Sequence, residues 1–335
     1  MRILVVGGTQ FVGRHIVSTL LAQGDQVTLF HRGRTNPDLF PEAEHRLGDR
    51  DVDLSALAGG TWDATVDSSA YVPRQVRALA RVLGDRGGRY VHISSVSAYG
   101  EVSGPGYDEG TPLAVLEDPA VETVDAATYG GLKALCEQAA LESFAGPGGP
   151  GTSVSIVRPT YVAGPYDHTG RFTWWVERVA QGGRVVAPAP RDHPFQVVDA
   201  RDLAEFVALL AHGGAQGIFH AAGPPPPYSF ADFLATVVAE VGPPGTELVW
   251  VAEEVLARAG VTEAELPLWA ATAADRYLSA ADPARAIAAG LRLRPLSQTV
   301  RDVHEQQQSQ PPALRLPARL SPERERELLG AEARS

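Results

Sequence analysis

The sequence predicts an α/β fold built around a doubly wound parallel sheet, with a smaller α/β lobe at its C-terminal side. The apolar strand at residues 3–6 leads through a glycine-rich turn straight into a helical pattern of apolar residues. Further apolar strands then alternate with helical stretches, which is typical of parallel strands joined by right-handed crossovers. After Pro159 this alternation gives way to aromatic clusters and a proline-rich run at 223–227. The change predicts a second lobe that covers a ligand site.

The individual elements follow from the periodicity of the apolar residues. Ser229 precedes the last predicted helix and can cap it, because its hydroxyl can accept a backbone N–H of the first turn. From about residue 308 the chain is proline-rich and then charged, and we expect a solvated appendage there. Strands are predicted at 3–6, 26–30, 64–67, 90–94 and 153–157, and helices near 12–21, 73–85, 127–145 and 230–241.

Composition and charge exclude several classes of protein. The 335 residues are 44% apolar and carry a formal net charge of −11 without a Lys/Arg block, which disfavours nucleic acid and anionic membranes as partners. No apolar run approaches the ~18 residues that a membrane-spanning helix needs. With Cys136 as the single cysteine and no His/Cys cluster at ligand spacing, neither a disulfide nor a metal site is expected. Because Met1 runs directly into the first strand, we expect no signal peptide and a cytoplasmic protein.

The glycine-rich turn at residues 7–13 predicts a nucleotide site of the Rossmann type. A turn between the first strand and the first helix points helix N–H groups at a pyrophosphate, and glycine lets the backbone approach it. Gln10 stands where the motif has its middle glycine. A tight strand-to-helix turn also needs glycine for its own backbone geometry. The turn therefore predicts a dinucleotide only together with the motifs that follow it.

Tyr129 and Lys133 are the candidate chemical pair. Their i,i+4 spacing places a phenol and an ammonium on one helical face, where the cation can lower the tyrosine pKa from about 10. Such pairs also arise on helices by chance. Ser95 lies in a serine cluster at the end of the predicted strand 90–94, and the carboxyl ends of parallel strands open onto the ligand crevice. The order of glycine turn, serine cluster and Tyr-x-x-x-Lys favours a catalytic site.

With these motifs the chain resembles the extended short-chain dehydrogenase/reductase superfamily, in its NAD-dependent epimerase/dehydratase branch. The similar segments are the glycine turn, the Ser-x-x-x-Tyr-Gly pattern at 95–100, the Tyr129/Lys133 pair, the segment 158–165 and the strand-to-helix element 198–204. The resemblance extends over residues 1–310 and implies a Rossmann-type sheet with a substrate lobe.

The resemblance also implies roles for single residues. Tyr129 would be the catalytic acid/base, Lys133 would bind the nicotinamide ribose and lower the Tyr129 pKa, and Ser95 would hydrogen-bond the reacting oxygen. Hydride would pass at a carbinol or carbonyl carbon of a sugar-like or small carbonyl substrate. Asp49 would meet the adenine amine, or it is simply a turn-forming aspartate. The implied cofactor contacts are Gly7, Thr9, Gln10, Phe11, Val12, Gly13, His31, Arg32, Arg34, Asp49, Ser69, Ala70 and Lys133.

The end of the second strand predicts NADP as the cofactor, with NAD possible. An NAD-preferring turn has an acid there, which accepts hydrogen bonds from the ribose hydroxyls. This chain has His31, Arg32 and Arg34 instead, and guanidinium groups can bind a 2′-phosphate bidentately. The alternative is that both arginines belong to a solvated loop or stack on adenine.

Further departures limit what the resemblance implies. Tyr161 stands where sugar-nucleotide enzymes have asparagine, and Val96 and Ser97 stand where sugar 4,6-dehydratases have an Asp-Glu pair. Gln10 is typical of atypical members, which also resemble chloroplast stem-loop RNA-binding proteins. We therefore expect an NAD(P)-dependent reductase or epimerase. The alternatives are an RNA-binding or nuclease-like relative and a non-catalytic dinucleotide-binding regulatory protein.

The substrate side is less defined by the sequence. Aromatic side chains that follow the turn at 164–165 could stack on a ring or pack in the core, and acidic side chains after Tyr99 could approach a polyol. Two histidines lack partners at metal or triad spacing and are expected to be surface or packing residues. The segment after the turn contains Arg171, Phe172, Trp174 and Trp175. The acidic side chains are Glu101, Asp108 and Glu109, and the two histidines are His168 and His193.

The domain organisation follows from these patterns. We expect a dinucleotide-binding domain at 1–165, to which segments near 195–222 return. A substrate-binding lobe is expected mainly at 166–310, followed by a charged tail at 311–335. A small molecule is the expected partner, and a homodimer could form through the helices near 75–85 and 130–145.

Overall fold

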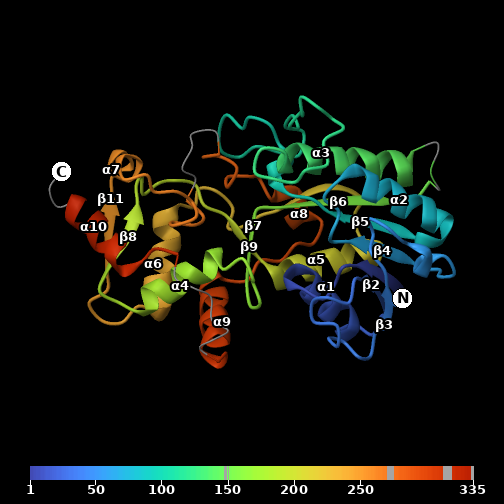
Figure 1. The fold of residues 1–335 in the computed structure, drawn as a ribbon, viewed down its shortest axis with the longest axis horizontal. Coiled ribbons are helices and arrows are strands. Elements are labelled where there is room, and N and C mark those ends of the chain that lie inside the picture. Colours follow the sequence, from blue (N-terminus) through green and yellow to red (C-terminus); the bar gives the residue numbers. More distant parts are fainter. Residues whose placement is uncertain (147–148, 150, 270–274, 312–318, 333–335) are drawn as a thin grey trace.

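The computed structural model describes residues 1–146, 149, 151–269, 275–311 and 319–332. A seven-stranded parallel sheet, in the order β10-β6-β5-β4-β1-β2-β3, forms one half of the elongated molecule and confirms the predicted fold class (Figure 1). Its strands are β1 (Arg2–Val6), β2 (Gln26–His31), β3 (Glu44–Leu47), β4 (Ala64–Asp67), β5 (Arg89–Ile93), β6 (Val154–Pro159) and β10 (Gly217–Ala221).

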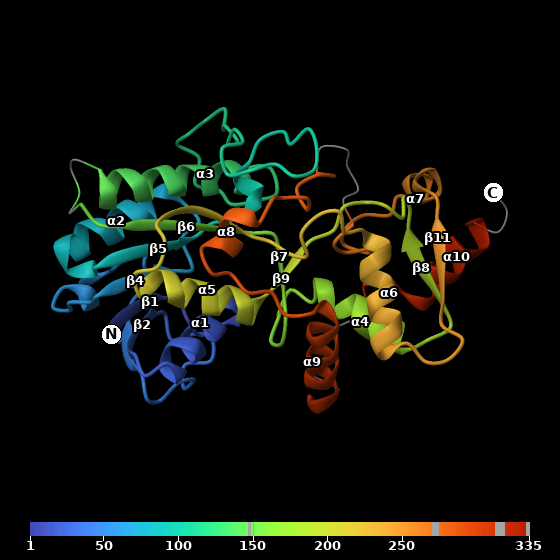
Figure 2. The ribbon, with the colours of Figure 1, turned by 180° about the vertical axis from the view of Figure 1, so that it is seen from behind.

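Helices cover both faces of this sheet. α1 (Phe11–Ala22) and α5 (Ala200–Ala211) pack together on one face, and α2 (Pro73–Leu83) and α3 (Tyr129–Ala140) pack on the other (Figure 2). The central strands β1, β4 and β6 are consequently buried almost throughout, including the charged residues Asp67 of β4 and Arg158 of β6. The same covering leaves the carboxyl ends of the strands free to form a site.

A second lobe lies beyond the carboxyl edge of the sheet. It contains a two-stranded parallel sheet of β8 (Arg184–Pro188) and β11 (Glu247–Val251). Its core holds the buried rings of Trp175, Phe230 and Phe233. The Ser229 hydroxyl accepts the Asp232 N–H, so the predicted cap is confirmed. Helices α4 (Arg171–Ala180), α6 (Phe230–Val241), α7 (Glu253–Arg258) and α9 (Leu296–Ser309) belong to this lobe.

A short parallel pair, β7 (Tyr161–Ala163) and β9 (Val197–Asp199), connects the two parts, and α8 (Ala284–Ala288) packs near β10. β9 leads directly into α5, which confirms the strand-to-helix element expected at 198–204. No described helix is long and apolar enough to cross a membrane.

The C-terminal stretch is not a solvated appendage throughout, which corrects the expectation. Residues 322–332 form α10 (Pro322–Glu332), which packs against β8, β11 and α7. Leu328 and Leu329 are buried in the second lobe's core. Glu325 accepts hydrogen bonds from the Arg178 side chain and from the Val186 N–H at 3.1 Å. The alternating charges of residues 322–327 predicted a solvated segment. The Glu325 carboxylate is instead buried, and its hydrogen-bond donors belong to the second lobe.

Candidate active site

The carboxyl ends of the central strands open into a cavity of about 930 Å³, which we name the sheet-end cavity. It extends from the glycine turn after β1 to α3 and on to α4 in the second lobe. Every predicted cofactor contact lines this cavity, as do Ser95 and Tyr129. The structure therefore brings the predicted site residues together at one edge of the sheet.

The glycine turn forms a close backbone cradle at one end of the sheet-end cavity. Gly7 and Gly8 have φ of 103° and 101°, a region that favours glycine. A Cβ on Gly13 would lie 2.8 Å from the Gly8 nitrogen, so helix and turn can approach only without a side chain. Gln10 has an extended backbone at φ −137°, which needs no glycine. Glutamine in place of the motif's glycine therefore leaves the backbone shape of the turn unchanged.

A loop after β2 closes over this cradle. The Asn36 side-chain amide donates to the Thr9 carbonyl oxygen at 2.8 Å, so the loop is fastened to the glycine turn. Sequence reasoning missed Asn36, and nothing in its local sequence marks it. Arg32 and Arg34 are on the same loop and line the cavity, with Arg32 exposed.

His31 has a structural task in this loop. Its Nδ1 accepts the Gly33 N–H at 3.1 Å, and its Nε2 lies 2.8 Å from His45 Nδ1. Burial, followed by the neighbouring His45, lowers the pKa of His31. Both ring nitrogens of His31 thus have partners within the fold. Of the three residues expected to bind the 2′-phosphate, Arg32 and Arg34 therefore remain available to a ligand.

Arg50 is the main residue of the sheet-end cavity that the sequence did not reveal. Its guanidinium donates two hydrogen bonds to Asp67 at 2.7 and 2.9 Å and one to the Ser69 hydroxyl at 3.0 Å. Although burial alone would raise it, Arg50 holds the pKa of Asp67 well below its usual range. The adjacent Asp49 carboxylate accepts the Asp51 N–H at 3.1 Å and also lines the cavity, so both interpretations of Asp49 stay open.

Tyr129, at the first position of α3, lies near Ser95. Burial raises the pKa of Tyr129 and the neighbouring Tyr71 adds to the increase, whereas a hydrogen bond with Ser95 lowers it. Ser95 is itself fixed, because its Oγ accepts the Ser97 N–H at 3.1 Å. The result is a protonated phenol held beside a positioned hydroxyl.

The ammonium of Lys133 is held by backbone carbonyl oxygens in this structure. Its Nζ donates to the carbonyl oxygens of Ala70 at 3.0 Å and Ile93 at 2.7 Å, and burial lowers its own pKa. The expected lowering of the Tyr129 pKa is therefore absent from this structure, where desolvation of the phenol dominates. Lys133 instead ties α3 to the ends of β4 and β5.

A buried ion pair supports the serine cluster from behind. Ser94 Oγ donates to Glu137, whose carboxylate also accepts two hydrogen bonds from Arg158, at 2.9 and 2.5 Å. Arg158 in turn donates to the Tyr99 hydroxyl at 2.5 Å, and Tyr99 pairs with His220. This network fixes the strand end that carries Ser95.

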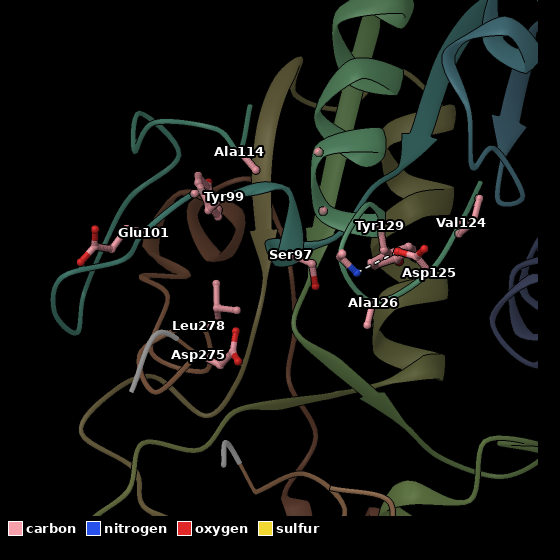
Figure 3. A pocket seen from close by; sticks show the side chains of 14 residues that line it. Ser97, Tyr99, Glu101, Ala114, Val124, Asp125, Ala126, Tyr129, Asp275 and Leu278 are labelled. Carbon is pink, nitrogen blue, oxygen red and sulfur yellow. Dashed lines mark hydrogen bonds between the residues drawn. The ribbon is translucent and has the colours of Figure 1, made fainter. Parts of the chain in front are cut away.

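A second cavity of about 690 Å³ lies on the other side of Tyr129 (Figure 3). We name it the acidic cavity, because Glu101, Asp125 and Asp275 line it. Tyr129, Ser97, Ala126, Asp275 and Leu278 border both cavities. Tyr129 thus stands at the junction of two spaces, as a group that acts on two bound molecules must.

The remaining predicted residues divide between the cavities and the core. Phe172, Trp174 and Trp175 are buried in the second lobe, so the packing alternative is right for all three and no substrate ring can stack on them. Arg171 lines the sheet-end cavity and its guanidinium lies 5.2 Å from the centre of the Tyr161 ring. Glu109 accepts the His220 N–H, Asp108 accepts the Gly110 N–H, His193 is buried and His168 is exposed.

The residues present fit a dinucleotide in the sheet-end cavity. The backbone cradle at Gly7, Gly8 and Gly13 would accommodate a pyrophosphate. Two buried polar atoms of the cavity wall, Arg50 Nε and Thr160 Oγ1, have no hydrogen-bond partner. Buried polar groups are normally paired, so these two atoms mark places for ligand atoms.

Comparisons with known proteins agree with this geometry. The model of the NAD dependent epimerase/dehydratase family matches residues 3–222. A curated relative, the chloroplast stem-loop binding protein of 41 kDa b from Arabidopsis thaliana, is 26% identical over 259 residues, which are 72% of this chain. The aligned part spans only 63% of that protein.

Solved structures share the fold over nearly the whole chain. The Thermus thermophilus UDP-glucose 4-epimerase in complex with NAD is 20% identical, with 92% and 100% of the two chains covered and a TM-score of 0.64. The Bordetella bronchiseptica enzyme WbmG in complex with NAD is 17% identical, with 92% and 94% covered and a TM-score of 0.67. The Thermotoga maritima UDP-glucose 4-epimerase with UDP-glucose is 18% identical, with 91% and 98% covered and a TM-score of 0.67.

Proposed function

Because this chain belongs to the NAD dependent epimerase/dehydratase family, we propose that it is an NAD(P)-dependent oxidoreductase or epimerase with Tyr129 as acid/base. The observation that carries the proposal is the position of Tyr129, between a glycine-cradled cavity and a second cavity large enough for a small molecule. The structural neighbours solved with NAD add support for the cofactor class.

The chain's own residues suit a proton transfer at the Tyr129 hydroxyl. When bound, the dinucleotide would supply the hydride donor or acceptor. Protonated Tyr129 would give its proton to a carbonyl oxygen in the reductive direction and be left as the phenolate, and in the reverse direction that phenolate would take the hydroxyl proton. Ser95 would orient that oxygen, and Lys133 would hold α3 against the strand ends.

We also propose a preference for NADP. Arg32 and Arg34 follow the end of β2 and line the sheet-end cavity, with no acid between them. Their charges would attract a 2′-phosphate dianion. Arg32→Ala combined with Arg34→Ala should weaken NADPH binding by roughly tenfold or more and leave NADH binding nearly unchanged. Equal affinity of the unmodified protein for NADH and NADPH, measured by fluorescence titration, would contradict this preference.

The acid/base proposal is tested by Tyr129→Phe, which removes only the hydroxyl. Turnover should fall by about 10²–10⁴, the usual contribution of a general acid/base, while the dinucleotide dissociation constant stays nearly constant. Tyr228→Phe is the matched control, because the Tyr228 hydroxyl contacts Thr236 in the second lobe. Substrates for the assay come from a screen of carbonyl compounds and sugars with cofactor absorbance as the readout. An unchanged rate in Tyr129→Phe would end the catalytic proposal.

The alternative of an RNA-binding protein, which the Gln10 turn raised, gains support from the name of the Arabidopsis relative. The net charge of −11 opposes it, because affinity for nucleic acid comes mainly from cations that displace counterions from phosphates. Tight, salt-sensitive binding of a structured RNA, together with no thermal stabilisation by NAD(H) or NADP(H), would favour the alternative instead.

A further inference from the structure

The acidic cavity and the sheet-end cavity differ in the charges of their described linings. The described lining of the acidic cavity contains the carboxylates of Glu101, Asp125 and Asp275 and no Lys, Arg or His. The described lining of the sheet-end cavity instead mixes both signs of charge: Arg32, Arg34, Arg50, Lys133 and Arg171 line it together with Asp49, Asp51, Glu263 and Asp275. Tyr129 borders both cavities, and so does Asp275.

Three separate segments supply these carboxylates. Glu101 follows the serine cluster after β5, Asp125 precedes α3, and Asp275 comes from the chain after α7; in Figure 3, Glu101 and Asp275 lie across from Asp125. Hydrogen bonds from Thr128 and Ala127 lower the pKa of Asp125, so it is ionised at neutral pH. Arg276, the neighbour of Asp275, pairs with Glu253 on α7. The described lining of the cavity therefore carries negative charge with no cation in it to offset that charge.

The carboxylates do not resemble a metal centre. Within the described residues there is no group of three or more His, Cys, Asp or Glu placed to hold a metal ion. Their oxygens can instead accept hydrogen bonds from hydroxyl or ammonium groups. The volume of about 690 Å³ suits a small organic ligand.

We propose that the acidic cavity receives a substrate that carries hydroxyl or ammonium groups and no phosphate, such as a free sugar or amino sugar. This proposal rests on the function proposed above, because it places the reacting carbon beside Tyr129. A nucleoside-diphosphate sugar, such as the UDP-glucose of the Thermotoga structure, brings a pyrophosphate that three carboxylates repel. The acidic lining thus selects against the anionic substrate class.

A charge series on one sugar skeleton tests the proposal directly. Glucosamine, glucose and glucuronate are bound to the protein saturated with its dinucleotide, and each dissociation constant is measured by ligand-observed NMR. Glucosamine should bind tightest and glucuronate weakest, with roughly three- to tenfold steps that shrink at about 1 M salt. Equal constants for the three, the reverse order, or no binding of any of them would overturn the proposal.

A variant locates the effect in the cavity. Glu101→Gln keeps the size of the side chain and should reduce the preference for glucosamine over glucuronate by roughly threefold. Glu205→Gln on α5, whose carboxylate contacts Arg294, is the matched control and should keep the full preference. The same change in preference in both variants would show a general field of the molecule and overturn the assignment to this cavity.

Different results would refute the proposed substrate class and the proposed function. Turnover of UDP-glucose that disappears in Tyr129→Phe would refute the phosphate-free substrate and leave the acid/base role intact. Absence of a preference for glucosamine over glucuronate, together with normal dinucleotide binding, would likewise refute only the substrate class. Absence of any dinucleotide binding would remove the proposed function itself, whatever the sugars do.

Discussion

The sheet-end cavity and the acidic cavity share the Tyr129 ring but are built in different ways. The first is walled by strand ends, a glycine turn and a buried ion pair, with Asp67 fully buried beneath it. The second is walled mainly by loops, and its carboxylates at Glu101, Asp125 and Asp275 are exposed. The difference teaches that one wall contributes to the stability of the fold, whereas the other can change its chemistry at little cost to the fold.

The strongest test of this difference is Arg50→Met. It leaves the Asp67 carboxylate buried without its partner, so the free energy of unfolding should fall by about 3–5 kcal/mol in urea denaturation. Arg74→Met breaks ion pairs with Asp51 and Glu122 that are about half exposed and should cost no more than about 1 kcal/mol. Equal losses of unfolding free energy in the two variants would show that the wall of the sheet-end cavity contributes no more to stability than an exposed ion pair does.

A second test concerns the glycine cradle. In Gly13→Ala the new Cβ meets backbone atoms of Gly8 at 2.8 and 2.9 Å, and neither can move without opening the turn. We expect a loss of about 1–3 kcal/mol in stability, in spite of alanine's helix preference, and a loss of dinucleotide binding. Gly59→Ala, where a Cβ would meet nothing within 4 Å, is the control. Undiminished dinucleotide affinity in Gly13→Ala would mean that the cradle is not needed for the ligand.

A third test uses pH. Burial, followed by the nearby Lys133, lowers the pKa of His92 to about 3, so the folded protein keeps this imidazole neutral. Below about pH 6.5 the unfolded chain binds a proton that the folded chain does not, and His92 should reduce the free energy of unfolding by about 1.4 kcal/mol per pH unit down to about pH 3. His92→Leu should remove this share of the slope between about pH 6.5 and 4 and leave the slope between about pH 7 and 8 unchanged. The measurement is urea unfolding at a series of pH values, and an unaltered acid slope would contradict the burial argument.

The smallest expected change is in the stability of Glu101→Gln. Its side chain is exposed on a loop, so the free energy of unfolding should stay within about 0.5 kcal/mol of the unmodified protein. The same variant should change the sugar preference described above. A loss of stability as large as that of Gly13→Ala would show that the loop wall, too, contributes to the fold.

This contrast also explains what the sequence could predict. The sheet-end cavity is marked by local patterns, since a glycine turn and Tyr-x-x-x-Lys place their residues through short-range geometry. The strands β3 and β10 were not predicted, because β3 is polar and half exposed and the short β10 carries His220 among its apolar residues. Neither pattern stands out without its neighbours in the sheet.

The residues that the sequence did not reveal depend on contacts between distant segments. Arg50 meets Asp67 through the pairing of strands, and Asn36 reaches Thr9 across a loop. The acidic cavity likewise combines three loops whose proximity no local motif encodes. The helical spacing placed Lys133 near Tyr129, but it could not show that the Lys133 ammonium donates to the carbonyl oxygens of Ala70 and Ile93, which lie on other segments.

The docking of α10 has a consequence for the order in which the chain matures during synthesis. The large sheet has all its strands once residue 221 has been made. The second lobe, however, obtains Leu328, Leu329 and the Glu325 partner of Arg178 only from residues 322–332. On the ribosome, the sheet can therefore form before α10 has been made, while the apolar surface of the second lobe that α10 covers is still exposed.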